Sequence, residues 1–258
     1  MTLYQKLRWL TRMGIGETIS ETPINRLIKQ EKKITAITDI PPSEVQIKPQ
    51  TDTTVQAAIA AATTATDITS LSTLLHSFEL ATLKKTAAHT VFARGNPTAP
   101  LMIIGDIPEA SDDLSGQPFM GESGNLLSKM MAGIGLNVET DCYLTTLIPW
   151  RAPGGRKPTP AEIAYCLPFV KRHIELANPR FILLFGALTS GALLGIDSLS
   201  RARGAFHMYQ SENLSAPIPV TATFSPAYLL KNQSHKKYAW EDLKRLKAKI
   251  GESESESI

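Results

Sequence analysis

Two segments of this chain carry residue types that catalysis or ligand binding would need. GDIPEASDD (105–113) places Asp106 directly after an apolar run, and GQPFMGESG (116–124) holds Phe119 among three glycines. A carboxylate at such a place can stabilise positive charge or hold a water. An aromatic ring flanked by glycines, which let a backbone approach a ligand closely, can stack on a flat ligand. The plainer alternatives are a solvated turn for Asp106 and a core side chain for Phe119.

A third segment, RAPGGRKPTP (151–160), is cationic. It contains Arg151, Arg156 and Lys157 together with proline and glycine, and it has no acidic residue. This composition after a strand favours contact with phosphate groups, with a plain surface loop as the alternative.

A fourth segment, TFSPAYLLKNQSHKK (223–237), combines polar and cationic residues. Ser225 precedes a proline at the end of a predicted strand, and Lys231 and two further lysines follow. The Ser-Pro pair is also typical of a capped helix start. The lysines suit a DNA backbone or a solvated helix face equally.

Alternating strands and helices are predicted to position these segments. Apolar runs predict strands over 101–106, 142–148, 181–186, 205–209 and 218–224, and helical spacing with caps predicts helices over 122–135, 159–178, 187–195 and 235–250. This alternation is typical of a three-layer α/β/α domain with a largely parallel central sheet. Ligands of such sheets bind beyond the carboxyl ends of the strands. We therefore expect the site in the loops after Asp106, Leu147, Gly186 and Phe224.

The composition is that of an ordinary folded protein. The 258 residues are 43% hydrophobic and 20% charged, and the net charge of +3 permits a polyanionic partner without requiring one. Two cysteines, Cys142 and Cys166, are too few for a disulfide-rich secreted fold. The chain shows no signal-peptide pattern and no apolar run long enough to span a bilayer. We expect a cytoplasmic monomer without a membrane partner.

The chain is predicted to have one main domain with appendages. An amphipathic helix is expected over 1–18, and a polar flexible linker over 19–66. The main domain is expected over 67–250, followed by a disordered acidic tail over 251–258.

Seven segments, in this order and spacing, resemble the family 4 uracil-DNA glycosylases, the iron–sulfur type. They are VFARGNP, LMIIGDIPEASDD, GQPFMGESGNLL, CYLTTLIPWRAPGGRKPTPAEIAYCLPF, ILLFGALTSGALLG, RGAFHMY and TFSPAYLL. The resemblance covers roughly residues 75–250. It implies a protein that flips deoxyuridine out of DNA, stacks the base on an aromatic ring and hydrolyses the N-glycosidic bond.

The resemblance assigns roles to individual residues. Phe119 matches the stacking ring, and Asp106 matches a catalytic carboxylate that the family supplies from a glutamate. Ser225 stands where the family has a histidine that stabilises the departing uracil. Thr146 stands where the family has an asparagine that reads the base. Further substrate contacts are expected from Gly105 and Ile107, and DNA contacts from Arg151, Arg156, Lys157 and Lys231.

Several matched positions depart from the family pattern. The Asp106 side chain is one methylene shorter than a glutamate, and a misplacement of about 1 Å can cost about a hundredfold in rate. Glu109 replaces a glycine and adds charge near the expected DNA path. Cys166 matches one cluster-ligand position, but Trp150 stands at another. Because an iron–sulfur cluster needs four cysteines or close substitutes, the sequence predicts no metal and no cofactor.

Three functional hypotheses follow. The first is a uracil-DNA glycosylase with weakened activity, with Asp106 and Ser225 as catalytic residues. The second is a non-catalytic DNA-binding relative that recognises damaged, flipped or abasic nucleotides. The third is a small-molecule N-glycoside hydrolase or nucleotide-binding module, against which the basic segments argue.

Overall fold

The computed structural model describes residues 50–79 and 81–255. All of these residues belong to one compact unit, Ile47–Ile258. The helix predicted over 1–18 and the linker residues before 50 lie outside the described residues.

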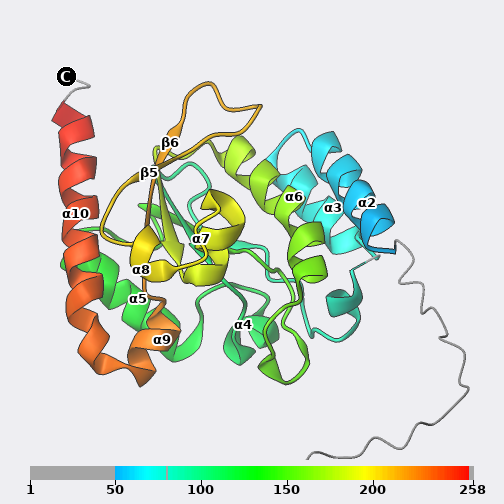
Figure 1. Cartoon of the computed structure of the whole chain (residues 1–258), viewed down its shortest axis with the longest axis horizontal. Helices are drawn as coiled ribbons and strands as arrows, with labels where there is room; N and C mark the ends of the chain where they lie inside the picture. The colour runs from blue at the N-terminus through cyan, green and yellow to red at the C-terminus, as the bar shows by residue number, and fades with distance from the viewer. Residues whose placement is uncertain (1–49, 80, 256–258) are drawn as a thin grey trace, which may run out of the picture. The chain divides into compact units, whose positions relative to one another are not determined.

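A six-stranded sheet forms the centre of the described unit (Figure 1). Its strands are β1 (Ala93–Gly95), β2 (Leu101–Gly105), β3 (Cys142–Thr146), β4 (Phe181–Phe185), β5 (His207–Tyr209) and β6 (Ile218–Thr223), in the spatial order β1-β3-β2-β4-β6-β5. The four central strands are parallel, and the edge strands β1 and β5 are antiparallel to their neighbours. The predicted largely parallel sheet is confirmed.

Helices cover both faces of this sheet. They are α2 (Gln50–Thr64), α3 (Ile68–Ser77), α4 (Ala110–Ser115), α5 (Gly121–Gly133), α6 (Pro160–Ala177), α7 (Ala187–Leu194), α8 (Leu199–Ala202), α9 (Pro226–Lys231) and α10 (Lys236–Ser255), with short 3-10 turns at Thr82–Lys85, Pro153–Gly155 and Gln233–His235. Among the described residues, no helix is both long and apolar enough to cross a membrane.

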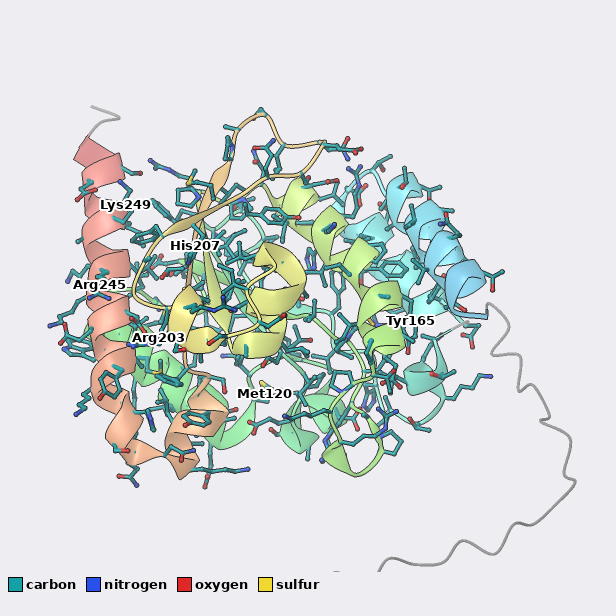
Figure 2. The ribbon with its side chains drawn as sticks, viewed as in Figure 1. Met120, Tyr165, Arg203, His207, Arg245 and Lys249 are labelled. Carbon is teal, nitrogen blue, oxygen red and sulfur yellow. The ribbon has the colours of Figure 1, made fainter. Side chains whose placement is uncertain are left out.

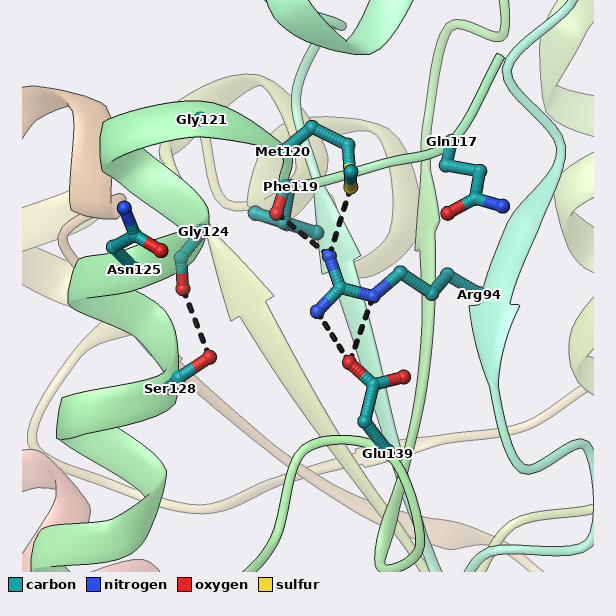
Figure 3. A pocket seen from close by; sticks show the side chains of 9 residues that line it. All are labelled: Arg94, Gln117, Phe119, Met120, Gly121, Gly124, Asn125, Ser128 and Glu139. Atoms are coloured by element: carbon teal, nitrogen blue, oxygen red, sulfur yellow. Dashed lines mark hydrogen bonds and ion pairs between the residues drawn. The ribbon is translucent and has the colours of Figure 1, made fainter. Parts of the chain in front are cut away.

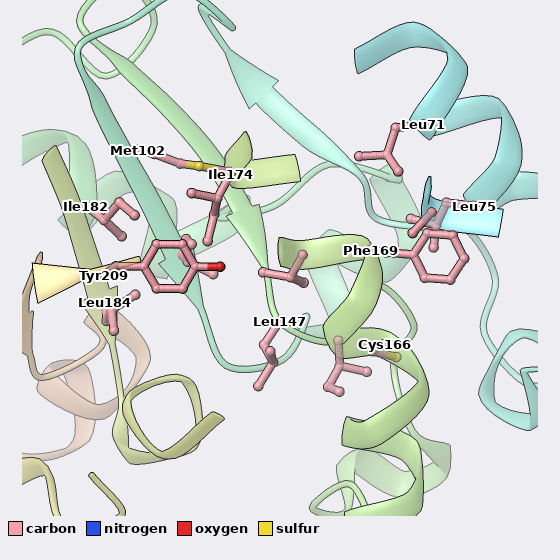
Figure 4. Packing of buried hydrophobic residues seen from close by; sticks show 14 of the residues in the cluster. Leu71, Leu75, Met102, Leu147, Cys166, Phe169, Ile174, Ile182, Leu184 and Tyr209 are labelled. Atoms are coloured by element: carbon pink, nitrogen blue, oxygen red, sulfur yellow. The ribbon is translucent and has the colours of Figure 1, made fainter. Parts of the chain in front are cut away.

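The three layers follow from the alternation of side chains along the strands. In β2, Met102 and Ile104 join the core formed with α2, α3 and α6, while Leu101 and Ile103 join the core formed with α5 and α10. Figure 4 shows the first of these cores, in which Met102 lies near Ile174 of α6. All five β2 residues are buried, as expected for a strand with helices on both faces.

Helix α6 shows how local sequence sets an element's ends. Thr159 accepts a hydrogen bond from the backbone N–H of Glu162, and the Glu162 side chain accepts one from Thr159, which forms a capping box. Pro160 occupies the first helical position, where its missing N–H costs nothing. At the other end, Asn178 takes a left-handed conformation and stops the helix.

The predicted linker and tail need correction at their inner ends. Residues 50–64 of the expected linker form helix α2, whose buried face carries Ala58 and Ala62. Arg172 of α6 donates two hydrogen bonds to the carbonyl of Ala65 just beyond it. The described unit therefore begins earlier than residue 67. The expected tail is also shortened, because α10 continues to Ser255.

A buried carboxylate joins α10 to the sheet. Asp242 accepts hydrogen bonds from the Thr223 hydroxyl of β6 (2.7 Å) and from the Arg203 guanidinium (3.0 and 3.1 Å). Figure 2 shows Arg203 beside α10. Burial raises the pKa of Asp242, while Thr223 and Arg203 oppose that rise. This network fixes the end of β6, where the segment with Ser225 begins.

The packing of α2 against α6 can be tested with two alanines of the same helix. Ala58→Asp would bury an unpaired carboxylate and should lower the free energy of unfolding by about 3 kcal/mol or more. The exposed Ala60→Asp should change it by less than about 0.5 kcal/mol. Urea unfolding of both variants is the measurement. Equal stabilities would show that 50–64 behaves as a linker.

Candidate active site

A cavity of about 470 Å³ lies at the carboxyl ends of the parallel strands. Loops after β2, β3 and β6 and the segment before α5 contribute its walls. The lining residues are Gly105, Asp106, Ile107, Pro108, Glu109, Ala110, Asp112, Phe119, Ser123, Thr146, Arg151, Gly155, Ser225, Pro226, Ala227 and Lys231. The structure therefore brings together eight of the ten residues expected at the site, all but Arg156 and Lys157.

Asp106 is the most strongly held polar group of this cavity. Its Oδ1 atom accepts hydrogen bonds from the Thr189 backbone N–H (2.8 Å) and from the Thr189 hydroxyl. Burial raises the pKa of Asp106, and these hydrogen bonds partly offset the rise. Thr189 lies in the first turn of α7, where N–H groups without helical partners favour a carboxylate. The arrangement fixes the carboxylate in one orientation.

A glycine makes room for this carboxylate. A Cβ atom on Gly186 would lie 2.0 Å from Asp106 Oδ2, and the glycine φ of +114° is one that other residues rarely adopt. Gly186 follows β4 and caps α7, so the close approach depends on this one residue.

The tip of the Phe119 ring packs against the carboxyl end of β2. A Cβ atom on Gly105 would lie 2.8 Å from the Phe119 ring, so only glycine fits at the end of β2. The ring also meets Phe185 edge-to-face, with centroids 5.8 Å apart and planes at 64°. Phe119 is 8% exposed and belongs to the α5-side core while lining the cavity. The stacking and core interpretations of this residue are thus compatible.

The loop that carries Phe119 is held by an arginine (Figure 3). Phe119 has a left-handed backbone conformation with φ of +56°. Arg94 of β1 donates from Nη1 to the Phe119 carbonyl (3.0 Å) and to Met120 Sδ (3.1 Å), and its other nitrogens donate to Glu139. Gly124 is required opposite, since a Cβ there would lie 1.8 Å from the same carbonyl.

A buried carboxylate, Asp112, joins the two loops of the site. Asp112 accepts hydrogen bonds from the backbone N–H of Glu109 (2.9 Å) and of Met120 (2.6 Å). Burial raises the pKa of Asp112, and the backbone hydrogen bonds work against that rise. The segment after Asp106 and the segment with Phe119 therefore move as one piece.

Two hydroxyls line the cavity with different capacities. Ser225 Oγ accepts a hydrogen bond from the Tyr228 N–H (3.3 Å) as the cap of α9, so its own proton is available to a ligand. Thr146 Oγ1 donates to the Ile148 carbonyl (2.8 Å), so toward a ligand it can only accept. Ser225 is thus both a helix cap and a potential donor.

The four cations expected to bind DNA are not equivalent. Arg151 and Lys231 line the cavity, and Lys157 lines a neighbouring cavity of about 610 Å³ that shares Asp106 and Ile107 with the first. Arg156 forms a two-pronged pair with Glu162 (2.6 and 2.8 Å), which raises the pKa of Arg156. Glu162 of α6 therefore supplies a counter-charge to Arg156, which Arg151, Lys157 and Lys231 do not share in the ion pairs of the described residues.

The fold and cavity define a class of α/β protein whose ligand site lies at the carboxyl edge of a parallel sheet. The family model "Uracil DNA glycosylase superfamily" matches residues 92–244. The chain belongs to this superfamily.

Individual relatives agree with this assignment. The chain is 33% identical to a Type-4 uracil-DNA glycosylase of Archaeoglobus fulgidus over 57% of this chain and 75% of the relative. It is 32% identical to that of Saccharolobus solfataricus over 64% and 78%, and 30% identical to that of Thermotoga maritima over 63% and 83%.

These relatives correct the prediction that the protein has no iron–sulfur cluster. Type-4 enzymes are the iron–sulfur family, and neither the similarity nor the structure shows that a cluster has been lost. In the part of the chain that the structure describes, no three His, Cys, Asp or Glu side chains gather as a metal-binding group. Cys166 is buried in the same core as Trp150. The residue roles proposed below do not involve a cluster.

Sequence reasoning missed several residues that hold the site. Thr189, Gly186, Arg94 and Glu139 act through partners that are distant in sequence. Asp112 lines the cavity and acts through nearby backbone N–H groups. Thr189 was detectable only as a hydroxyl near the start of a short helix after a strand, which by itself points to no partner.

The hydrogen bonds from Arg94 to the loop that carries Phe119 lead to a prediction about that loop. Arg94→Met should speed amide hydrogen exchange in residues 119–121, because the Phe119 carbonyl loses a donor, and it should cost about 1–3 kcal/mol of stability. Glu139→Gln is the matched control, since it keeps Arg94 in place. Unchanged exchange in Arg94→Met would show that the glycines alone hold the loop.

The raised pKa of Asp106 leads to a prediction about the free energy of unfolding. A carboxyl whose folded pKa is raised stabilises the fold only while it is protonated, so its ionisation at neutral pH is a cost. Asp106→Asn should therefore raise the free energy of unfolding at pH 7. The gain should shrink as pH falls through the raised pKa. Denaturation at pH 7 and pH 4 measures this, and a variant less stable at pH 7 would contradict it.

Proposed function

We propose that this protein is a uracil-DNA glycosylase of DNA repair, which hydrolyses the N-glycosidic bond of deoxyuridine in DNA. The observation that carries the proposal is that three groups line one cavity. They are the Asp106 carboxylate, which Thr189 holds, the Phe119 ring and the Ser225 hydroxyl. Membership of the superfamily and the names of the relatives support the same reaction.

Asp106 is the proposed catalytic carboxylate. When the bond between C1′ and N1 breaks, uracil leaves with the electron pair and the sugar becomes positively charged. The carboxylate stabilises that charge and accepts a proton from the water whose oxygen bonds to C1′. Because Thr189 already orients Asp106, little reorganisation is needed during the reaction.

The departing base is bound by the opposite walls. Phe119 stacks on the uracil ring, and the Ser225 hydroxyl donates to a uracil carbonyl oxygen as negative charge develops there. Thr146 accepts from the base, and Gly105 and Ile107 complete its pocket. These roles use the free proton of Ser225 and the acceptor of Thr146.

The DNA backbone is proposed to follow the cavity rim. Arg151 and Lys231 contact phosphates on either side of the flipped nucleotide, and Lys157 contacts a more distant one. Glu109, which also lines the cavity, weakens this attraction and lowers activity. We propose that the protein acts as a cytoplasmic monomer, which light scattering of the purified chain at working concentration checks.

The catalytic assignment is tested by single-turnover release of uracil from an oligonucleotide with one deoxyuridine. Asp106→Asn should lower the rate about 100-fold or more, because asparagine keeps the shape but neither the charge nor the basicity. Glu122→Gln, an exposed change in the first turn of α5, should leave the rate unchanged. Full activity of Asp106→Asn would disprove the assignment.

Ser225 is tested in the same assay with two substitutions. Ser225→Ala should lower the rate by up to about 100-fold, because it removes the proposed donor. Ser225→Thr keeps a hydroxyl and the helix cap and should retain most activity. Full activity of Ser225→Ala, or an equal loss of activity in Ser225→Thr, would contradict the proposed role of the hydroxyl.

A non-catalytic DNA-binding role is the second candidate. Glu109 in the cavity and the internal bond of the Thr146 hydroxyl favour it. Stoichiometric protein that binds DNA in a salt-dependent manner but releases no uracil would support this role over the first.

A further inference from the structure

A group of aromatic rings follows β6 beside the cavity. Phe224, Tyr228, His235 and Tyr238 contact one another, and we call these four residues the aromatic cluster. Phe224 and Tyr228 stack with centroids 5.2 Å apart and planes at 13°. His235 lies between the others, with centroids 5.0, 5.5 and 5.9 Å from those of Phe224, Tyr228 and Tyr238.

The two tyrosines of the cluster are open to solvent. Tyr228 is 39% exposed and Tyr238 is 42% exposed, although both rings are held by aromatic neighbours. Phe224 covers one face of Tyr228, so the open area belongs to the rest of that ring. Rings that are rigid and yet exposed form a surface on which a flat group can stack at small entropic cost.

The packing inside the cluster, and not a hydrogen bond, holds its central ring. His235 Nδ1 is buried, and it has no hydrogen-bond partner among residues 50–79 and 81–255. The Arg203 guanidinium lies 5.3 Å from the Phe224 centroid and 5.2 Å from that of Tyr238, and it is paired with Asp242. The cluster is therefore fixed to α10 and β6 before any ligand arrives.

The surroundings of the cluster are cationic. Residues 223–240 contain Lys231, Lys236 and Lys237 and no acidic residue. All three lysines are exposed, and Lys237 Nζ lies 4.9 Å from the Tyr238 centroid. Exposed aromatic rings interleaved with lysines match the chemistry of a nucleic-acid strand, whose bases stack while its phosphates are neutralised.

The cluster is continuous with the proposed active site. Tyr228 lies on α9 between Ala227 and Lys231, and both of these residues line the cavity. The 3-10 turn Gln233–His235 joins α9 to α10 and contacts both, and Figure 1 shows α9 beside the first turns of α10. A strand whose nucleotide enters the cavity beside Ser225 would reach Tyr228 with its next bases.

We propose that the aromatic cluster binds unpaired bases next to the target nucleotide, so that the site acts preferentially on uracil in single-stranded DNA. This inference rests on the proposed function, because DNA in the cavity sets the strand path. Bases in a duplex are stacked on each other and paired, so their faces are not available to Tyr228 and Tyr238. Bases of a single strand offer those faces freely.

Binding to uracil-free DNA tests the inference without any catalysis. We would measure dissociation constants by fluorescence anisotropy for a single-stranded 15-mer and for its blunt duplex. Tyr228→Ala with Tyr238→Ala should weaken single-strand binding at least tenfold, and duplex binding less than threefold. Tyr228→Phe with Tyr238→Phe should bind like the parent because the rings remain. Met208→Ala, at an exposed residue of β5, is the control for surface change.

A second measurement does not depend on the variants folding correctly. A single strand that carries 5-iodocytosine, irradiated on the unmodified protein, should crosslink to Tyr228 or Tyr238. Crosslinks only elsewhere, or equal losses of single-strand and duplex binding in the alanine variant, would overturn the inference.

The outcomes separate the inference from the proposed function. A single-strand preference in binding that is lost in the alanine variant, with no uracil release, would leave the base-binding role of the aromatic cluster standing and refute the glycosylase proposal. Uracil release at equal rates from single-stranded and duplex DNA, unchanged in the alanine variant, would support the glycosylase proposal and refute the inference.

Discussion

The site depends on one interaction, the seating of the Asp106 carboxylate against the first turn of α7. That seating requires Gly186, whose missing Cβ leaves space, and Thr189, whose N–H and hydroxyl are the donors. Both lie after β4, while Asp106 lies after the neighbouring β2. The parallel pairing of these strands therefore builds the carboxylate site. This position disfavours the ionised form of Asp106, because burial raises the pKa of its carboxyl group.

A few side chains also hold the remaining walls of the cavity in place. Asp112 ties the loop after Asp106 to the Phe119 loop, and Arg94 ties that loop to β1. The Phe119 ring packs against Gly105, the residue before Asp106. The end of β2 therefore sets the positions of both the ring and the carboxylate. These hydrogen bonds and close contacts thus tie the loops of the site to one another and to the sheet.

Much of the fold was predictable because its signals are local. Apolar runs such as 101–106 and 181–186 give buried parallel strands, and the rule that ligands bind at strand carboxyl ends brought Asp106 and Ser225 to one place. Helix α2 escaped prediction because QTDTTVQAAIAAATT buries small alanines against α6, and alanine gives a weak amphipathic signal.

The partners of the site residues were not predictable in the same way. The ion pair of Arg156 could not be predicted from the sequence, because its partner Glu162 belongs to the next helix and also caps it. The hydrogen-bond direction of Thr146 and Ser225 depends on backbone geometry that residue types do not specify. The prediction about the cluster failed for another reason: it was drawn from missing cysteines alone, whereas the relatives are Type-4 enzymes.

The proposed mechanism requires the partly buried Asp106 carboxylate to be ionised for the glycosidic bond to break. The most direct measurement is the pH dependence of single-turnover uracil release. The rate should fall as pH decreases, with a midpoint above the ordinary aspartate value of about 3.9. Asp106→Asn should abolish that acid limb. A rate independent of pH down to about 4, or the same acid limb in Asp106→Asn, would contradict the claim.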